Sequence, residues 1–278
     1  MRTPSGFTGY VEFTPSFTPR PGVTHVLFDF DGTLSLIREG WPEVMAPMFA
    51  ELLPPRPDET DAQRLQLCLD DIMRLNGKQT IYQMIQLAER IRERGGEPRA
   101  PLWYKHEYLR RLEARIATRK EGLRSGRIQP DELLVHGARA LLEFLARRGF
   151  ALYLASGTDE VFVKEEAVLL DVERYFGPRV YGALDNYQNF SKKLVIERIL
   201  RENNIPGAQL LSFGDGYVEI LNTKEAGGLA VAVASDESNN GSGRVDDWKR
   251  QRLLGVGADV VIADFRDAEA LLARILDR

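Results

Sequence analysis

The stretch His25-Val26-Leu27-Phe28-Asp29-Phe30-Asp31-Gly32-Thr33 joins a short apolar run to two carboxylates and a glycine. An apolar run bounded by turn residues is typical of a buried strand in a parallel sheet. In an open α/β sheet, ligands bind outside the carboxyl ends of the strands, where Asp29 and Asp31 fall. Two carboxylates this close are costly to bring together unless a cation or a protonation role compensates. The stretch therefore predicts a core strand with a reactive group at its end, although a turn with Asp and Gly is the structural alternative.

Similar apolar runs recur later in the chain and alternate with helical patterns. The predicted strands are residues 150–155, 179–181, 210–213, 229–234 and 260–263, and the predicted helices are 137–148, 161–170, 192–203, 218–226 and 268–276. Strands that alternate with helices imply right-handed crossovers between parallel strands. We therefore expect an α/β fold with a doubly wound parallel sheet.

A long insert follows the first of these strands. About 120 residues separate it from the next strand, far more than an ordinary connection. The insert shows four helical patterns, with breaks at prolines and glycines; they lie at 42–53, 60–75, 79–94 and 102–121. We predict an N-terminal extended arm (1–23), a core domain (24–35 and 131–278) and an inserted helical domain (36–130). The aromatic residues of the arm could pack on the chain's own sheet or mediate a homodimer.

Composition narrows the function classes. The 278 residues are 44% hydrophobic and 28% charged, which is typical of a soluble globular protein. A net charge of -4 gives no electrostatic reason to expect nucleic acid or an anionic membrane as partner. Cys68 is the only cysteine and there are three histidines, which disfavours disulfides, Cys-rich or His-rich zinc sites and a Ser-His-Asp triad. With no signal-like or membrane-length apolar segment, the expected location is cytoplasmic.

Polar residues also follow the later strands. Ser156 and Gly157 come after the strand at 150–155, where a hydroxyl and backbone N–H groups at a helix start would suit phosphate; a simple helix N-cap is the alternative. Lys192, or its neighbour Lys193, opens a predicted helix, where a cation opposes the helix dipole and needs an anion or good solvation.

The strand at 210–213 ends in the string Gly-Asp-Gly-Tyr-Val-Glu, residues 214–219. Asp215 lies at the strand end, and Glu219 lies one turn into the next helix. Carboxylate oxygens from separate strands are what a hard cation such as Mg²⁺ prefers. The sequence therefore predicts a magnesium site that combines this strand end with that of Asp29.

In chain order, D-F-D-G-T at 29–33, Ser156, Lys192 and G-D-G-x-x-E at 214–219 resemble the four motifs of the haloacid dehalogenase (HAD) superfamily. The resemblance covers roughly 23–35 and 131–278. It implies a HAD Rossmann-like core and makes the insert similar to a C1-type cap, as in the phosphoglycolate phosphatases and β-phosphoglucomutases.

The resemblance also implies a mechanism. Asp29 would be the catalytic nucleophile that forms an aspartyl-phosphate, and Asp31 the general acid and base. Mg²⁺ would be held by the carboxylates of Asp29 and Asp215 and the backbone carbonyl of Asp31, with Glu219 positioning metal-bound water.

The phosphoryl oxygens would contact Ser156, Gly157 and Lys192. An Asp at position 31 favours phosphate-ester cleavage or phosphomutase chemistry over dehalogenase, phosphonatase or ATPase chemistry. The leading hypothesis is thus a Mg²⁺-dependent phosphatase, with a β-phosphoglucomutase-type mutase as alternative. A non-catalytic binding protein on the same scaffold is disfavoured, because the carboxylates are all present.

A cap of this type implies a small phosphorylated metabolite as the partner. Asn76, Lys78 and Thr80, in a loop between two helices of the insert, are the predicted substrate contacts, together with Arg38 after the first motif. An ordinary interhelix turn with an exposed lysine is the alternative at this loop.

Overall fold

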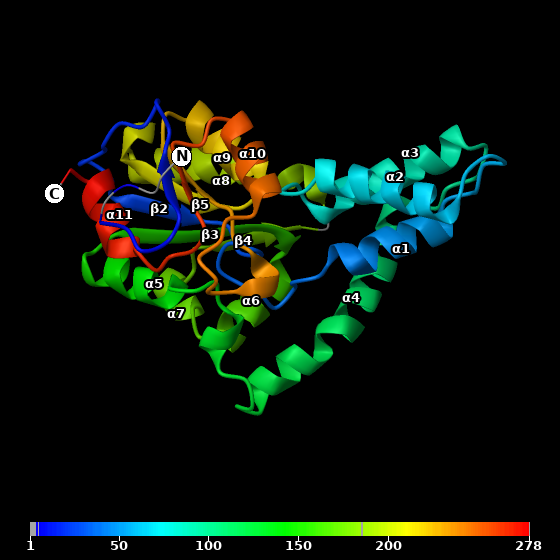
Figure 1. Cartoon of the computed structure of the whole chain (residues 1–278), viewed down its shortest axis with the longest axis horizontal. Coiled ribbons are helices and arrows are strands. Elements are labelled where there is room, and N and C mark those ends of the chain that lie inside the picture. Colours follow the sequence, from blue (N-terminus) through cyan, green and yellow to red (C-terminus); the bar gives the residue numbers. More distant parts are fainter. Residues whose placement is uncertain (1–3, 5, 185, 278) are drawn as a thin grey trace. The chain divides into compact units, whose positions relative to one another are not determined.

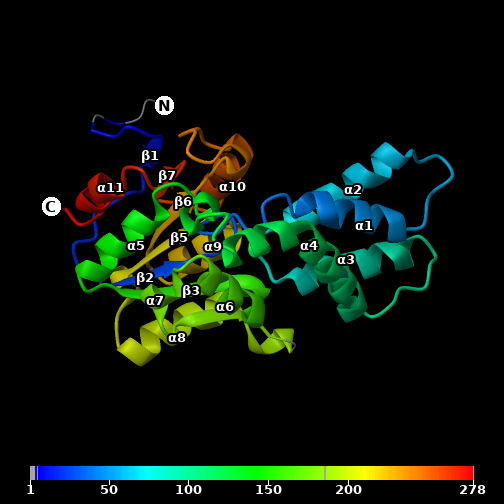
Figure 2. The same ribbon diagram turned by 90° about the horizontal axis from the view of Figure 1, so that it is seen from below.

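The computed structural model describes residues 4, 6–184 and 186–277. Its contacts divide the chain into two compact units. One contains Met1–Glu39 and Lys120–Arg278, and is called the core unit here. The other contains Gly40–Arg119, and is called the helical unit. The elements of each unit can be followed in Figure 1 and, after a quarter turn, in Figure 2.

The core unit is built on a seven-stranded sheet in the order β1-β7-β6-β5-β2-β3-β4. Its strands are β1 (Val11–Phe13), β2 (His25–Phe28), β3 (Ala151–Asp159), β4 (Val180–Ala183), β5 (Leu210–Gly214), β6 (Leu229–Val233) and β7 (Val260–Ile262). Strand β1 runs antiparallel to β7, and the other pairs are parallel. The prediction of a mostly parallel α/β sheet is confirmed.

Helices cover both faces of this sheet (Figure 1). They are α5 (Ala138–Arg147), α6 (Glu160–Leu169), α7 (Glu173–Phe176), α8 (Lys192–Asn203), α9 (Tyr217–Glu225), α10 (Asp247–Gly255) and α11 (Ala268–Ile275). Helices α8, α9 and α10 lie on one face, and α5, α6 and α7 on the other. On the first face, Val195, Ile196 and Ile199 of α8 pack with Leu27 and Tyr153 of the sheet, which buries the apolar side of the helix. The strand ends that carry the candidate site residues thus belong to a close-packed sheet and helix layer.

The helical unit consists of α1 (Pro42–Leu52), α2 (Asp61–Arg74), α3 (Thr80–Glu93) and α4 (Pro101–Arg124), of which α4 ends in the core unit. Helix α2 begins with a capping box between Thr60 and Gln63. Helices α2 and α3 are joined by an ion pair of Asp71 with Arg90, at 2.7 Å. None of the described helices is long and apolar enough to cross a membrane.

Three features differ from the sequence prediction. The predicted extended arm contributes an edge strand, β1. Helix α10 was not predicted, because its sequence is mostly charged and polar. Strand β3 runs on to Asp159, beyond the expected end near residue 155. The last difference matters at the site, because residues 156–158 belong to a strand.

Candidate active site

The carboxyl ends of three neighbouring strands meet at one edge of the sheet. Phe28 of β2 is paired with Leu154 of β3 on one side and with Phe213 of β5 on the other. The residues that follow these three positions therefore emerge side by side. In this way the register brings Asp29 next to the segments that carry Ser156 and Asp215.

A tight turn after β2 shapes the first of these ends. The carbonyl of Phe30 accepts hydrogen bonds from three successive amides, those of residues 33–35, at 2.8–3.2 Å. Gly32 has φ +73°, a conformation that glycine adopts without strain. A Cβ at Gly32 would lie 2.3 Å from Oδ2 of Asp215, so the turn needs glycine for space as well.

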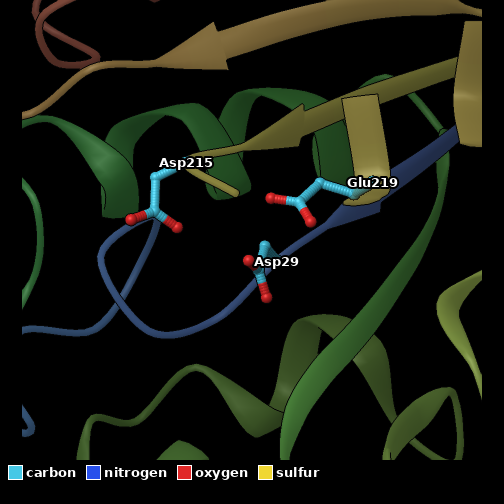
Figure 3. A group of neighbouring side chains, drawn as sticks. All are labelled: Asp29, Asp215 and Glu219. Atoms are coloured by element: carbon cyan, nitrogen blue, oxygen red, sulfur yellow. The ribbon is translucent and has the colours of Figure 1, made fainter. Parts of the chain in front are cut away.

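Three carboxylates converge beside this turn (Figure 3). One oxygen each of Asp29, Asp215 and Glu219 lies within 4.8 Å of the others. Glu219 reaches the cluster from α9 by folding back over Gly214, where a Cβ would lie 2.2 Å from its Cγ. All three side chains are buried. The donor set, with only oxygen ligands close together, fits a hard divalent cation such as Mg²⁺.

Lys192 lies between two members of the cluster, Asp29 and Glu219. Its Nζ is 2.8 Å from Asp29 Oδ2 and 2.8 Å from Glu219 Oε2. The second oxygens are also bonded: Asp29 Oδ1 accepts from the Phe30 amide at 2.8 Å, and Glu219 Oε1 from the Gly216 amide at 2.5 Å. The family resemblance predicts that Glu219 positions metal-bound water. In the structure its carboxylate forms an ion pair with Lys192. Lys193 is exposed and lies 3.5 Å from Glu225, so only Lys192 reaches the site.

Burial and mutual repulsion govern the charges of the cluster. Burial and then the Glu219 charge raise the pKa of Asp29 well above its usual value, although Lys192 opposes them. Burial raises the pKa of Asp215 to about 6, against the Lys249 ammonium. Burial alone would raise the pKa of Glu219 too, but the Lys192 ammonium lowers it overall. A divalent cation at these oxygens would favour the ionised carboxylates, which again fits a metal site.

Asp31 faces the other side of the turn. Its Oδ2 accepts hydrogen bonds from Ser156 Oγ at 3.1 Å and Thr158 Oγ1 at 2.8 Å. Its Oδ1 lies 3.8 Å from Arg38 Nε. Hydroxyls on one oxygen and a guanidinium near the other hold this carboxyl in place.

The expected helix start at Ser156 is wrong. Residues 156–158 continue strand β3, and α6 begins at Glu160 with Asp159 as its N-cap. The amides near Ser156 and Gly157 are therefore not those of a helix terminus. Ser156 still lies at the site, through its hydrogen bond to Asp31.

The predicted substrate contacts lie in two different units of the chain. Arg38 belongs to the core unit and is buried, with its Nη2 2.7 Å from Glu166 Oε1. Asn76, Lys78 and Thr80 lie in the helical unit around the start of α3. Of these, Lys78 is exposed, with its Nζ 5.5 Å from the centre of the Tyr82 ring.

Four residues around the carboxylates were missed by sequence reasoning. Thr158 follows Ser156 closely enough that its hydroxyl could have been considered. The others lie far from any motif in the sequence, and no pattern points to them; they are Glu166, Glu237 and Lys249.

Comparison with known proteins agrees with this architecture. A family model described as haloacid dehalogenase-like hydrolase matches residues 23–227. No curated protein sequence matches.

Several solved structures are similar in fold. A haloacid dehalogenase-like family protein from Streptococcus pneumoniae is 21% identical with a TM-score of 0.56, over 90% of this chain and 97% of that one. A predicted phosphoglycolate phosphatase from Haemophilus somnus is 14% identical with a TM-score of 0.60, over 90% and 98%. A candidate β-phosphoglucomutase from Thermotoga maritima is 20% identical with a TM-score of 0.53, over 91% and 100%. At these identities the likeness shows the fold alone.

Proposed function

Because the chain belongs to the haloacid dehalogenase-like hydrolases, we propose that it is a Mg²⁺-dependent phosphatase that hydrolyses a small phosphate monoester through an aspartyl-phosphate. The observation that carries this proposal is the pair of carboxylates on one tight turn, in two different settings. Asp29 is buried in the acidic cluster and pairs with Lys192. Asp31 instead accepts hydrogen bonds from hydroxyls of strand β3. Two carboxyls with separate surroundings suit two separate roles.

In the proposed reaction, an oxygen of Asp29 attacks phosphorus and the ester oxygen leaves with the bonding electrons. Asp31 donates its proton to that leaving oxygen. Asp31 then takes a proton from a water molecule, whose oxygen attacks phosphorus and releases Asp29 and inorganic phosphate. Bound Mg²⁺, held by Asp29, Asp215 and the Asp31 carbonyl, would offset repulsion between the nucleophile and the phosphate.

The remaining residues of the site bind and orient. Lys192 is positioned to hold both Asp29 and a phosphoryl oxygen, because a lysine ammonium has three donors and two are used in the structure. Ser156 and Gly157 would contact the other oxygens. Glu219 holds Lys192, a role that its short contact supports.

The helical unit and the structural neighbours bear on the substrate class. The helical unit, as a cap of the family type, favours a small soluble phosphorylated metabolite in the cytoplasm over nucleic acid or a membrane. A sugar phosphate or a phosphoglycolate-like acid fits the structural neighbours called phosphoglycolate phosphatase and β-phosphoglucomutase. Those names also support a phosphomutase as the second candidate.

Phosphate release decides between the two candidates. Purified protein would be incubated with a panel of small phosphate esters, with Mg²⁺ or with EDTA, and both inorganic phosphate and ester isomers would be measured. Metal-dependent phosphate release is the expected result. Isomer formation without phosphate release would identify a mutase, and neither product from any ester in folded protein would contradict the proposal.

A further inference from the structure

A second buried lysine lies at the site, and the proposed mechanism does not use it. Lys249, from α10, is 7% exposed. Its Nζ lies 3.0 Å from Asp215 Oδ2, 2.6 Å from Glu237 Oε1 and 3.4 Å from Ser235 Oγ. The other oxygen of Asp215 accepts from Thr33 Oγ1 at 3.3 Å. Both oxygens of this expected metal ligand are therefore bonded within the chain.

Lys249 is held in place by its own helix. Its amide donates to the Asp246 side chain, the N-cap of α10, at 2.9 Å. The next residue, Arg250, bonds to both carboxylate oxygens of Glu12 in β1, at 2.6 and 2.9 Å. These contacts fix the backbone at Lys249, while burial and the three Nζ contacts hold the ammonium beside Asp215.

The charges around the cluster leave a defined deficit. The groups involved are the carboxylates Asp29, Asp215, Glu219 and Glu237 and the ammonium groups Lys192 and Lys249. When all are ionised, two negative charges are uncompensated, which matches one divalent cation. Without Lys249 the deficit would be three, and the attraction for a cation would be stronger.

We infer that Lys249 sets the affinity of this site for its divalent cation. Its ammonium group pairs with Asp215, and this positive charge weakens cation binding so that the cation stays exchangeable. The inference rests on the proposed metal-dependent function and goes beyond it, because it assigns the control of affinity to one side chain. Glu237 has the opposite effect, since it offsets the Lys249 charge.

Calorimetric titration of Mg²⁺ into the substrate-free protein tests this directly. Lys249→Met keeps the apolar stem and removes the charge, and should lower the Kd for Mg²⁺ by about tenfold or more. Glu237→Gln should raise the Kd by about the same factor, because Lys249 is then uncompensated. The double variant restores the original net charge and should bind within about threefold of the wild type.

Lys224→Met is the matched control. Lys224 also forms an ion pair with a buried aspartate, Asp259, at 2.6 Å, but Asp259 precedes β7 and so lies at the amino end of the strands, away from the site. The Kd of the Lys224→Met variant for Mg²⁺ should equal that of the wild type.

If Lys249→Met binds Mg²⁺ as weakly as the wild type, or more weakly, the inference is overturned. Should that variant not fold, Glu237→Gln decides: weaker binding supports the inference, and unchanged binding overturns it. Wild-type protein that binds no Mg²⁺ would contradict the proposed function itself, whereas binding that ignores these two residues contradicts only the inference.

Discussion

Gly32 shows how a single residue shapes the site, because its position requires glycine for two separate reasons. Its φ of +73° favours glycine, and a Cβ there would lie 2.3 Å from the Asp215 carboxylate. We expect Gly32→Ala to displace Asp215 and to weaken Mg²⁺ binding by at least about tenfold, since ligand geometry is lost. Gly149→Ala is the control, with φ +78° and nothing within 4 Å of the added atom. Calorimetry that finds equal Mg²⁺ affinity in both variants would contradict this account of the turn.

Lys192 and Lys193 are neighbours in sequence with opposite surroundings. Lys192 is buried between two carboxylates, so its removal leaves uncompensated charge in the interior. We expect Lys192→Met to lower the free energy of unfolding by about 3–5 kcal/mol in EDTA. The exposed pair of Lys193 should contribute less than about 1 kcal/mol, so Lys193→Met is the control. Urea denaturation measures both, and equal losses would show that Lys192 is not the buried counter-ion described here.

At the scale of elements, periodicity predicted most of the core and failed where polarity dominates. Helix α8 was predicted with its observed bounds, because its apolar residues follow the helical period and Ser191 caps it. Helix α10 was missed, since charged and polar residues fill five of its nine positions. The extension of β3 was missed because Ser156 and Gly157 are not typical strand residues. The register with β4 shifts after Ala155, and pairing resumes only at Asp159.

The residues of the candidate site were predictable only where they stand at strand ends. Asp29, Asp31 and Asp215 follow apolar runs, so their position at the carboxyl ends of strands could be predicted from the sequence. Lys249 comes from a helix without a pattern and reaches the site only through tertiary packing. Its contacts could not be predicted from spacing.

Strand β1 and helix α10 are joined by a partly buried ion pair, Glu12 with Arg250, whose contribution to stability depends on pH. Hydrogen bonds from Arg250 lower the pKa of Glu12 below its usual value, against the effect of burial. A lowered pKa means stability that is present above the unfolded value of 4.5 and is lost as the pH falls through the folded pKa. We therefore expect Glu12→Gln to lower the Tm at pH 7, and the difference from the wild type to shrink below about pH 4.5.

Thermal unfolding across this pH range measures that difference. Glu202→Gln, which removes an exposed pair with Arg198, is the control and should change little at any pH. A Glu12→Gln difference that grows on acidification would have the wrong sign for this account.

At the scale of the whole molecule, the chain combines a core unit that carries the reactive carboxylates with a separate helical unit. The proposal assigns substrate selection to the helical unit, with exposed Lys78 as the contact for a second anionic group. We expect Lys78→Met to raise KM about fivefold or more for esters that carry a second anionic group, such as a carboxylate, and to leave KM for p-nitrophenyl phosphate unchanged. Arg92→Met, which removes another exposed cation of the same unit, should change neither. Steady-state kinetics with both kinds of ester measure this, and an unchanged KM for the esters with a second anionic group would remove Lys78 from the proposed contacts.

The central claim is that Asp29 becomes covalently phosphorylated, and trapping that species tests it most directly. The Asp31→Asn variant would be mixed with Mg²⁺ and p-nitrophenyl phosphate, whose good leaving group needs no proton from residue 31. The variant should then accumulate phosphoenzyme, because water attack lacks its base. Acid quenching and peptide mass spectrometry should find one phosphoryl group, on the peptide that contains Asp29, and none in Asp29→Asn/Asp31→Asn. A phosphoryl group on another residue, or phosphate release by Asp29→Asn at the wild-type rate, would contradict the account.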